Sequence, residues 1–222
     1  MVENNSDYSE YIELQDKMKE QVIKVDELPK NIRYVAGVDV AYNEDKELMV
    51  GAVVVLNIET LEVIDEAFHI MKIKFPYVPG LFSFREIPAI KEAYFKLQIK
   101  PDIIVCDAQG IAHPKGIGMA THLGIELDKP TIGCAKKRLI GVYNKEELGN
   151  IKGSYKFLKL DNNIIGAVLR TQTDIKPMFV SIGHKVSLNT AIELLNKLTP
   201  HYRLPETTRM ADQLVNSIIK EV

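Results

Sequence analysis

The predicted strand at residues 103–108 constrains the fold more than any other segment of this chain. It begins with the unbroken apolar run Ile103-Ile104-Val105-Cys106 and is bounded by Pro101 and Gly110. A short strand without polar alternation is typical of a parallel strand that is buried on both faces. This segment therefore predicts a sheet whose faces are covered by helices.

The segments around it predict how the sheet is built. Three alternating apolar segments come first and predict an antiparallel meander. Later strands alternate with helices, and Asp161-Asn162-Asn163 marks a hairpin turn. The predicted strands are 33–42, 48–58, 62–72, 103–108, 131–135, 155–160, 164–171 and 178–182. The predicted helices are an amphipathic one within 7–24, one that runs through Gln98 with a kink or break at Pro88, and those at 117–127, 187–198 and 206–221.

This order predicts an α/β fold, with a mixed sheet of three antiparallel strands and then parallel strands, flanked by helices. The 222 residues are 46% hydrophobic, which is enough for a sizeable core. No repeat or linker divides the sequence, so one domain is expected over 1–222. The formal net charge of −2 excludes a broadly basic nucleic-acid coat and leaves room for a local basic groove.

The same composition predicts where the protein works. Cys106 and Cys134 both lie in apolar runs, which disfavours a disulfide framework or a cysteine zinc site and fits a reducing compartment. The polar N-terminus lacks a signal-peptide pattern, and no apolar run approaches the roughly 20 residues that span a bilayer. We therefore expect a cytoplasmic protein that does not contact membranes.

Asp39 is the first candidate site residue. Strand alternation puts it on one face with Gly37 and Ala41, and these small neighbours predict room above it for an ion or a phosphate. Aspartate is depleted from strands, so its presence needs a reason. An edge or solvent-facing aspartate is the alternative interpretation.

Two further acids complete a possible metal site. Asp107 follows the buried run at 103–106, at the carboxyl end of a strand, where ligands bind in open α/β sheets, although a turn or N-cap role is an alternative. Glu86 shares a helix face with Ile90 and Leu97, and a carboxylate in an apolar stripe needs a partner or a cation. Oxygen ligands favour Mg²⁺ or Mn²⁺, which support two-metal phosphodiester hydrolysis.

A stiff loop precedes Glu86. In Phe75-Pro76-Tyr77-Val78-Pro79-Gly80, two prolines fix the backbone on either side of one aromatic residue. Such a loop resembles a wedge that inserts between stacked bases. A tight turn whose tyrosine packs on the core is the alternative.

Together these motifs resemble the endonuclease V family, the deaminated-base repair nucleases of the ribonuclease H-like fold. The resemblance covers roughly residues 34–213 and rests on several ordered motifs. These are Gly37-Val38-Asp39, Pro76-Tyr77-Val78-Pro79-Gly80 with Phe84-Arg85-Glu86, Asp107-Ala108-Gln109-Gly110-Ile111-Ala112-His113-Pro114, Gly133-Cys134-Ala135-Lys136, Ser181-Ile182-Gly183-His184 and Pro205-Glu206-Thr207-Thr208-Arg209-Met210-Ala211-Asp212.

The resemblance implies a Mg²⁺-dependent endonuclease, with Mn²⁺ able to substitute, that cleaves the second phosphodiester 3′ to a hypoxanthine nucleotide and leaves 3′-hydroxyl and 5′-phosphate ends. It implies that Asp39 and Asp107 are metal ligands and that Glu86 is either a further ligand or an acid that supports the ligands without touching the metal. Asp212 would close the site, and Lys136 would lie near the scissile phosphate or the attacking water. The implied substrate-binding residues are Pro76, Tyr77, Pro79, Gly80, Phe82, Ala108, Gly110, His113 and Leu139.

The implied partner is inosine-containing DNA or single-stranded RNA, bound by a monomer without an obligate protein partner. Four alternatives remain open: an inosine-specific endoribonuclease, a structure-specific nuclease such as a junction resolvase, a lesion-binding module without catalysis, and an ATP-handling domain of related fold. The three acids disfavour the non-catalytic module. The missing Gly/Thr-rich phosphate loop after Asp39 disfavours the ATP-handling domain.

Overall fold

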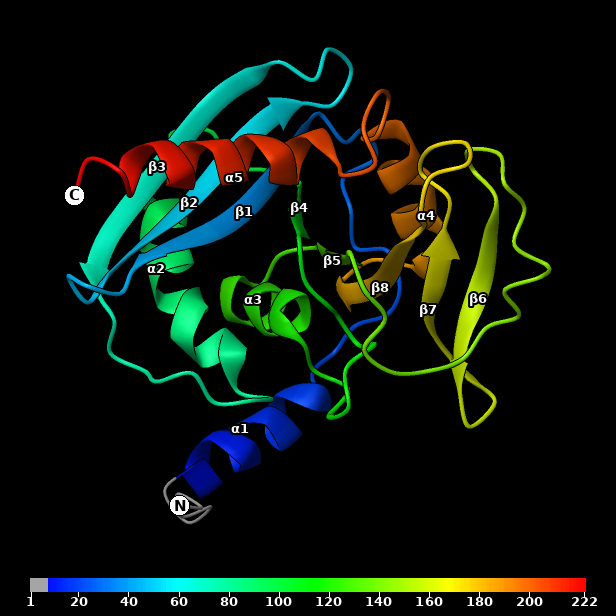
Figure 1. Cartoon of the computed structure of the whole chain (residues 1–222), viewed down its shortest axis with the longest axis horizontal. Coiled ribbons are helices and arrows are strands. Elements are labelled where there is room, and N and C mark those ends of the chain that lie inside the picture. The colour runs from blue at the N-terminus through cyan, green and yellow to red at the C-terminus, as the bar shows by residue number, and fades with distance from the viewer. Residues whose placement is uncertain (1–7) are drawn as a thin grey trace.

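The computed structural model describes residues 8–222 and is built on one eight-stranded sheet. The strands lie in the order β3-β2-β1-β4-β5-β8-β7-β6 (Figure 1). Their bounds are β1 Tyr34–Asn43, β2 Leu48–Asn57, β3 Val63–Lys72, β4 Ile103–Cys106, β5 Thr131–Ala135, β6 Tyr155–Leu160, β7 Asn163–Leu169 and β8 Met178–His184. The helices are α1 Ser9–Lys19, α2 Phe82–Lys96, α3 Met119–Leu127, α4 Leu188–Lys197 and α5 Glu206–Ile218.

The sheet is mixed, as predicted. Strands β1, β2 and β3 form an antiparallel meander, and β4 joins the other side of β1 in parallel. Strand β5 continues the parallel part, whereas β8, β7 and β6 return to antiparallel pairing. All four residues of β4 are buried, which confirms the interpretation of the apolar run as a central parallel strand.

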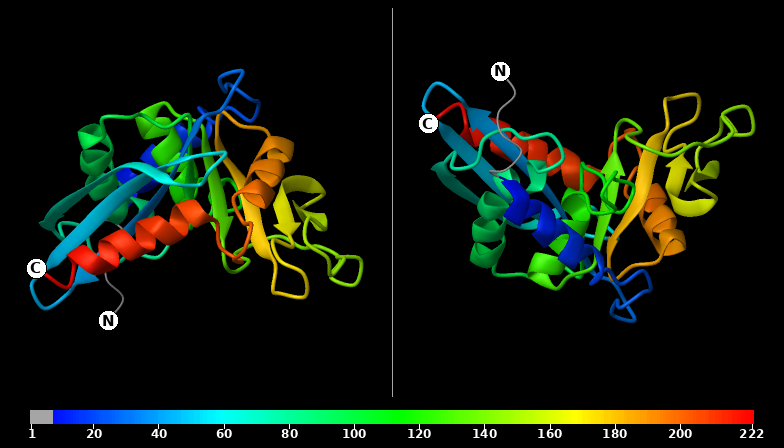
Figure 2. Two further views of the ribbon diagram at one scale, coloured as in Figure 1. Left: turned by 90° about the horizontal axis from the view of Figure 1, so that it is seen from above. Right: turned by 90° about the horizontal axis from the view of Figure 1, so that it is seen from below.

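Helices cover both faces of this sheet (Figure 2). Helices α2 and α3 pack on one face, where Ile90 and Leu123 meet Ala36 and Val38 of β1. Helices α4 and α5 cover the other face, and there Val215 of α5 meets β2. Within residues 8–222, no helix is both long and apolar enough to cross a membrane.

The predicted helices at 117–127, 187–198 and 206–221 differ from α3, α4 and α5 by one to three residues at their ends, and the two larger differences concern α1 and α2. Helix α1 ends at Lys19 rather than near residue 24, and the predicted start at residue 7 lies outside the described residues. Helix α2 continues through Pro88 to Lys96 and does not break there. Ile87 and Ala89 on either side of Pro88 are buried, so packing holds the helix across the missing backbone donor.

Candidate active site

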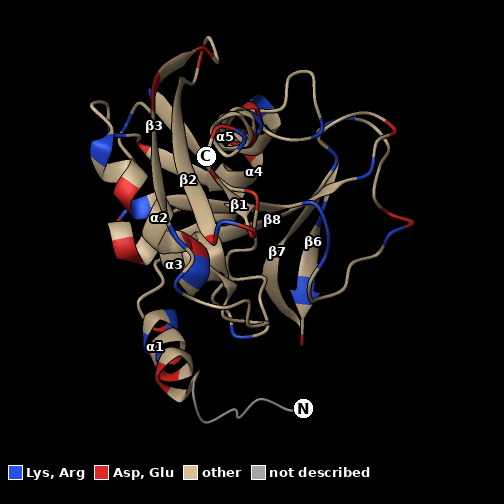
Figure 3. Ribbon diagram, turned by 60° about the vertical axis from the view of Figure 1, so that its left-hand side comes forward, with Lys and Arg blue, Asp and Glu red and all other residues tan. Residues whose placement is uncertain are grey.

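Asp39 and Asp107 lie at the centre of the sheet, on neighbouring parallel strands. Val38 pairs with Cys106, so Asp39 of β1 and Asp107, which follows β4, occupy equivalent positions one residue further on. Charged residues lie mainly on helices, loops and edge strands (Figure 3), which makes Asp39 unusual as an acid within a central strand. This pairing brings together two acids that are 68 residues apart in the chain, the difference between their numbers 107 and 39.

The face that carries Asp39 is covered by α5. A Cβ atom on Gly37 would lie 2.0 Å from the Thr207 carbonyl oxygen, so the space beside Gly37 is filled by helix backbone. Gly37 therefore does not leave open space on its own side of Asp39. Its small size instead lets α5 approach β1, and this approach brings the negative charge of Asp212 close enough to act on Asp39.

The carboxyl group of Asp39 is held in an unfavourable environment for ionisation. Burial raises its pKa to about 7, and the negative charges of Asp212 and Asp107 add to this effect. A backbone hydrogen bond from Val40 and the positive charge of Lys136 act in the opposite direction. The hydrogen bond and the charge of Lys136 are thus too weak to offset the effect of burial on the Asp39 carboxylate.

Glu86 approaches from the α2 face and is similarly perturbed. It is 7% exposed, and burial raises its pKa to about 8, with a further increase from the charge of Asp39. The Tyr42 hydroxyl donates a 3.0 Å hydrogen bond to Oε1 of Glu86. Arg85 does not pair with Glu86; its guanidinium lies 2.9 Å from Glu44 and stacks on the Tyr42 ring.

Lys136 supplies a cation to this site. Its Nζ lies 2.5 Å from Oδ2 of Asp107, and its side chain is 51% exposed. Burial lowers the pKa of Lys136, but the hydrogen bond and charge of Asp107 outweigh that effect and raise it overall. Lys136 follows β5 directly, beside β4, which explains the contact.

The acids fit a hard divalent cation by their chemistry. Among residues 8–222, no group of three or more His, Cys, Asp or Glu side chains is arranged so that it could hold a metal ion. The donors Asp39, Asp107, Glu86 and Asp212 are nevertheless all carboxylates, the ligand type that Mg²⁺ and Mn²⁺ prefer. Burial, together with a smaller repulsion between the acids, raises the pKa values of Asp39 and Glu86, and a bound cation would favour their ionised forms.

A cavity of about 720 Å³ opens beside Asp107. Of the predicted substrate-binding residues, its lining includes Tyr77, Pro79, Gly80, Phe82, Ala108, His113 and Leu139. Pro76 is exposed but does not line it. Gly110 does not line it either: Gly110 is buried, its N–H donates to Ser181 Oγ at 2.8 Å, and a Cβ atom there would lie 2.0 Å from the Ile182 carbonyl oxygen.

Residues 75–81, here called the wedge loop, form one wall of this cavity. Leu81 N–H donates to the Val78 carbonyl, and Gly80 has φ +86°, the pattern of a type II turn with Pro79 and Gly80 at its centre. Tyr77 is 66% exposed and meets Phe82 edge to face, with ring centroids 6.1 Å apart. The alternative of a tyrosine packed on the core is therefore wrong.

Two histidines predicted from motifs lie in different places. His113 borders the cavity, where burial lowers its pKa and its Nδ1 accepts from Lys115 N–H at 3.3 Å. His184 lies at the end of β8, outside the cavity, and its Nδ1 accepts from the Ile23 N–H at 3.3 Å. His184 thus contacts the segment after α1 rather than the acids.

Ser83 and Tyr42 are among the residues around the site that sequence reasoning missed, whereas the backbone of 108–110 was expected at the pocket. Ser83 and Gln109 line the cavity, and Tyr42 binds Glu86. The strand alternation of β1 contained a signal for Tyr42, because it places this residue on the same face as Val38, toward α2. Ser83 gave no such signal, since its position at the cavity depends on how two distant segments of the chain meet.

The mixed sheet flanked by helices, with acids on β1, on α2 and after β4, is an arrangement of the ribonuclease H-like fold class. Comparison with known proteins identifies the family within this class. The family model for endonuclease V matches residues 16–213. The chain belongs to the endonuclease V family and is an endonuclease.

Individual relatives agree over nearly the whole chain. Endonuclease V of Dictyoglomus thermophilum is 49% identical over 92% of this chain and 87% of its own. The crystal structure of endonuclease V from Streptomyces avermitilis has a TM-score of 0.89 at 42% identity, covering 96% of this chain and 93% of that one. Ciona intestinalis endonuclease V was solved in complex with a 24mer DNA containing an inosine followed by a ribo-adenosine. That structure has a TM-score of 0.85 at 27% identity, covering 98% of this chain and 99% of that one.

Proposed function

We propose that this protein is a metal-dependent endonuclease that recognises inosine in DNA and hydrolyses the second phosphodiester bond 3′ to it, leaving 3′-hydroxyl and 5′-phosphate ends. The observation that carries the proposal is the position of the wedge loop, which borders the same cavity as Asp107. A base held in that cavity would lie next to the acids. The inosine-containing DNA bound by the Ciona intestinalis relative supports the choice of lesion.

Asp39, Asp107 and Glu86 would hold the metal, which we propose to be Mg²⁺, with Mn²⁺ as a substitute. The family implies a divalent-metal requirement. When bound, such an ion supplies a Lewis acid that neutralises phosphodiester charge and lowers the pKa of a water. Asp212 adds negative charge on the α5 side of Asp39. Lys136, beside Asp107 and half exposed, would contact the scissile phosphate or orient the attacking water.

The wedge loop and cavity would supply selectivity. Tyr77 at the exposed tip of the loop would fill the base step that the lesion leaves, while Gly80, Phe82, Ala108 and Leu139 enclose the extruded base. Inosine pairs weakly, so extruding it costs less free energy than extruding a well-paired base. His113 would contact the base or a neighbouring phosphate from the other side of the cavity.

Cleavage of inosine-containing RNA is a second candidate. One observation favours it: the DNA bound by the Ciona intestinalis relative carries a ribo-adenosine after the inosine. A ribonucleotide at that position is compatible with a site that accepts a 2′-hydroxyl. Rates measured on matched inosine DNA and inosine RNA decide which nucleic acid is preferred.

We also propose that the chain works as one catalytic domain and as a monomer in the cytoplasm. The single continuous sheet supports the first part, because strands from residue 34 to residue 184 belong to it. Cys106 and Cys134 are free and buried, which fits a reducing compartment.

A labelled duplex with one inosine, incubated with the protein and Mg²⁺ or Mn²⁺, tests the proposal. We expect a nick one nucleotide beyond the lesion with a 5′-phosphate that phosphatase removes, and no nick in EDTA. A folded protein that leaves both the duplex and an inosine-containing RNA intact contradicts the proposal. Cleavage at the inosine itself contradicts the assigned position.

A further inference from the structure

Helix α1 has no role in the proposed chemistry, yet it contacts the wedge loop directly. The Nε2 amide of Gln15 donates a 2.8 Å hydrogen bond to the Gly80 carbonyl oxygen. Gln15 is only 2% exposed, an unusual position for a glutamine on an otherwise polar helix. A buried amide of this kind is retained where its hydrogen bond fixes a partner.

Aromatic contacts from α1 reach both ends of the same loop. The Tyr11 ring meets Phe75, at the start of the loop, with centroids 4.9 Å apart and planes at 75°. It also meets Phe84, in the first turn of α2, at 5.0 Å and 72°. Tyr8 adds a contact to Phe75 at 5.8 Å. Edge-to-face pairs of this kind fix geometry beyond simple burial.

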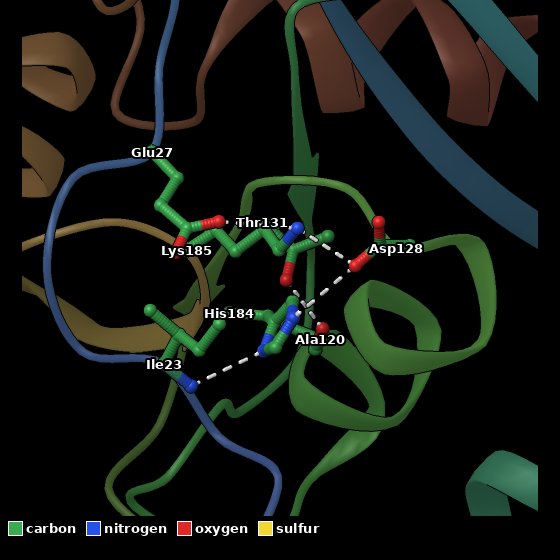
Figure 4. A network of polar contacts seen from close by, with 7 residues as sticks. All are labelled: Ile23, Glu27, Ala120, Asp128, Thr131, His184 and Lys185. Carbon is green, nitrogen blue, oxygen red and sulfur yellow. Dashed lines mark hydrogen bonds and ion pairs between the residues drawn. The ribbon is translucent and has the colours of Figure 1, made fainter.

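The segment that follows α1 is itself attached firmly to the body of the protein (Figure 4). Ile23 exchanges two hydrogen bonds with the end of β8, one to His184 Nδ1 at 3.3 Å and one from Lys185 N–H to its carbonyl at 2.8 Å. The Lys185 ammonium lies 3.1 Å from Glu27 and 2.7 Å from Asp128. The chain directly after α1 is therefore anchored to the segment that ends β8 and to Asp128.

A second buried contact holds the start of α2, directly after the wedge loop, from the α3 side. Ser83 Oγ lies 2.8 Å from Nδ1 of His122, which is 2% exposed. The wedge loop and the start of α2 are thus held from two helices, while Tyr77 at the tip is exposed and contacts Phe82. The contact from α1 acts on Gly80, the residue whose positive φ closes the turn beneath that tip.

We propose that Gln15 is a positioning residue for lesion recognition, which holds the Gly80 carbonyl and thereby fixes the height of the Tyr77 tip over the cavity. This inference rests on the proposed function, since it assigns a purpose to the same loop. Gln15 does not touch the cavity, so its effect is on binding of the lesion and not on bond cleavage.

The test compares Gln15→Met with Gln21→Met in the full-length protein. Methionine keeps the length of the side chain and removes the donor. Gln21 is a matched control because it is exposed and bonds only weakly, at 3.4 Å, to Lys17 of its own segment. For an inosine duplex with Mg²⁺, we expect Gln15→Met to raise KM about three- to tenfold, the effect of one hydrogen bond, and to change kcat less than about twofold. Gln21→Met should match the wild type.

Hydrogen exchange gives a readout that does not depend on activity. The Leu81 amide, which closes the turn, should exchange several-fold faster in Gln15→Met than in the wild type or in Gln21→Met, while the sheet amides keep their protection. Affinity for an inosine-free duplex should not change. If Gln15→Met does not fold, Tyr11→Leu, which removes the ring contacts to the same loop, should give the same rise in KM.

The outcomes separate this inference from the proposed function. A wild type that does not nick the inosine duplex contradicts the proposed function, and the exchange measurement then still decides whether Gln15 holds the loop. A normally active wild type with a folded Gln15→Met variant of equal KM and equal Leu81 exchange overturns the inference. A fall in kcat at unchanged KM overturns it as well.

Discussion

Lys136 and Asp107 form an ion pair across the ends of two neighbouring parallel strands, with Nζ 2.5 Å from Oδ2. The pair places a cation beside the acid that lies nearest to the cavity. Because the Lys136 side chain is half exposed, it can turn toward a phosphate that enters the site. This relationship distinguishes Lys136 from the adjacent basic residues Lys137 and Arg138.

We predict that Lys136→Met lowers kcat on an inosine duplex by about a hundredfold, the effect of removing one group that stabilises developing charge. Binding of the duplex should change much less. Lys137→Met is the matched control, since Lys137 is exposed and lines the cavity but pairs with no site acid in the described residues. It should alter the salt dependence of binding and leave kcat nearly unchanged. Equal effects of the two substitutions on kcat would exclude the assigned role.

The raised pKa values of Asp39 and Glu86, about 7 and about 8, predict how metal-free stability depends on pH. In the unfolded chain both groups lose their protons near pH 4, so between about pH 4 and pH 8 the folded state binds more protons. The free energy of unfolding should therefore fall as pH rises through this window.

Asp39→Asn and Glu86→Gln should each reduce this pH-dependent fall in the free energy of unfolding. In EDTA at pH 8, urea denaturation should show either variant to be more stable than the wild type by on the order of 1–3 kcal/mol, while neither cleaves. At pH 4 the difference should vanish. Saturating Mg²⁺ should stabilise the wild type more than either variant. A variant less stable than the wild type at pH 8 would argue against a site in which burial disfavours the ionised acids.

The exposed ring of Tyr77 predicts a defect in lesion binding. Tyr77→Ala should cost on the order of 1–3 kcal/mol of binding free energy for an inosine duplex, the range found for aromatic rings that stack on bases. Tyr77→Phe keeps the ring and should bind nearly as well as the wild type. Fluorescence anisotropy with a labelled duplex measures both. Unchanged affinity in Tyr77→Ala would remove the wedge from the account.

Gly37 and Gly80 require glycine for two different reasons, the close approach of a helix in one case and a positive φ in the other. Gly37→Ala should destabilise the protein by about 2–3 kcal/mol or more, because its Cβ would meet the Thr207 carbonyl at 2.0 Å and push α5 away. Gly80→Ala meets no atom within 4 Å and should cost only the strain of φ +86°, about 1 kcal/mol. Thermal unfolding monitored by circular dichroism tests this order, which the reverse ranking would contradict.

Much of the fold could be predicted because local patterns determine it. The apolar run at 103–106 identified a buried strand, and alternation in β1 sorted Asp39 and Val38 onto opposite faces. The ends of α1 and the continuity of α2 through Pro88 could not be predicted, since packing against neighbouring elements decides both.

Only part of the candidate site could be predicted from the sequence. Its acids stand out because carboxylates are rare inside apolar strands and stripes. The purpose of Gly37 and Gly110 was not predictable, because each is close to a segment far away in the chain: Thr207 in one case and Ile182 in the other. The contact of Gln15 with Gly80, 65 residues apart, is invisible for the same reason.

The most direct test of the account is a single-turnover cleavage measurement on two duplexes that differ only in inosine or guanosine at one position, with Mg²⁺. We predict that the wild type nicks only the inosine strand, one nucleotide 3′ to the lesion, and that Asp39→Asn binds that duplex without nicking it. Equal cleavage of both duplexes, or wild-type cleavage by Asp39→Asn, would contradict a metal-dependent nuclease directed by its wedge loop.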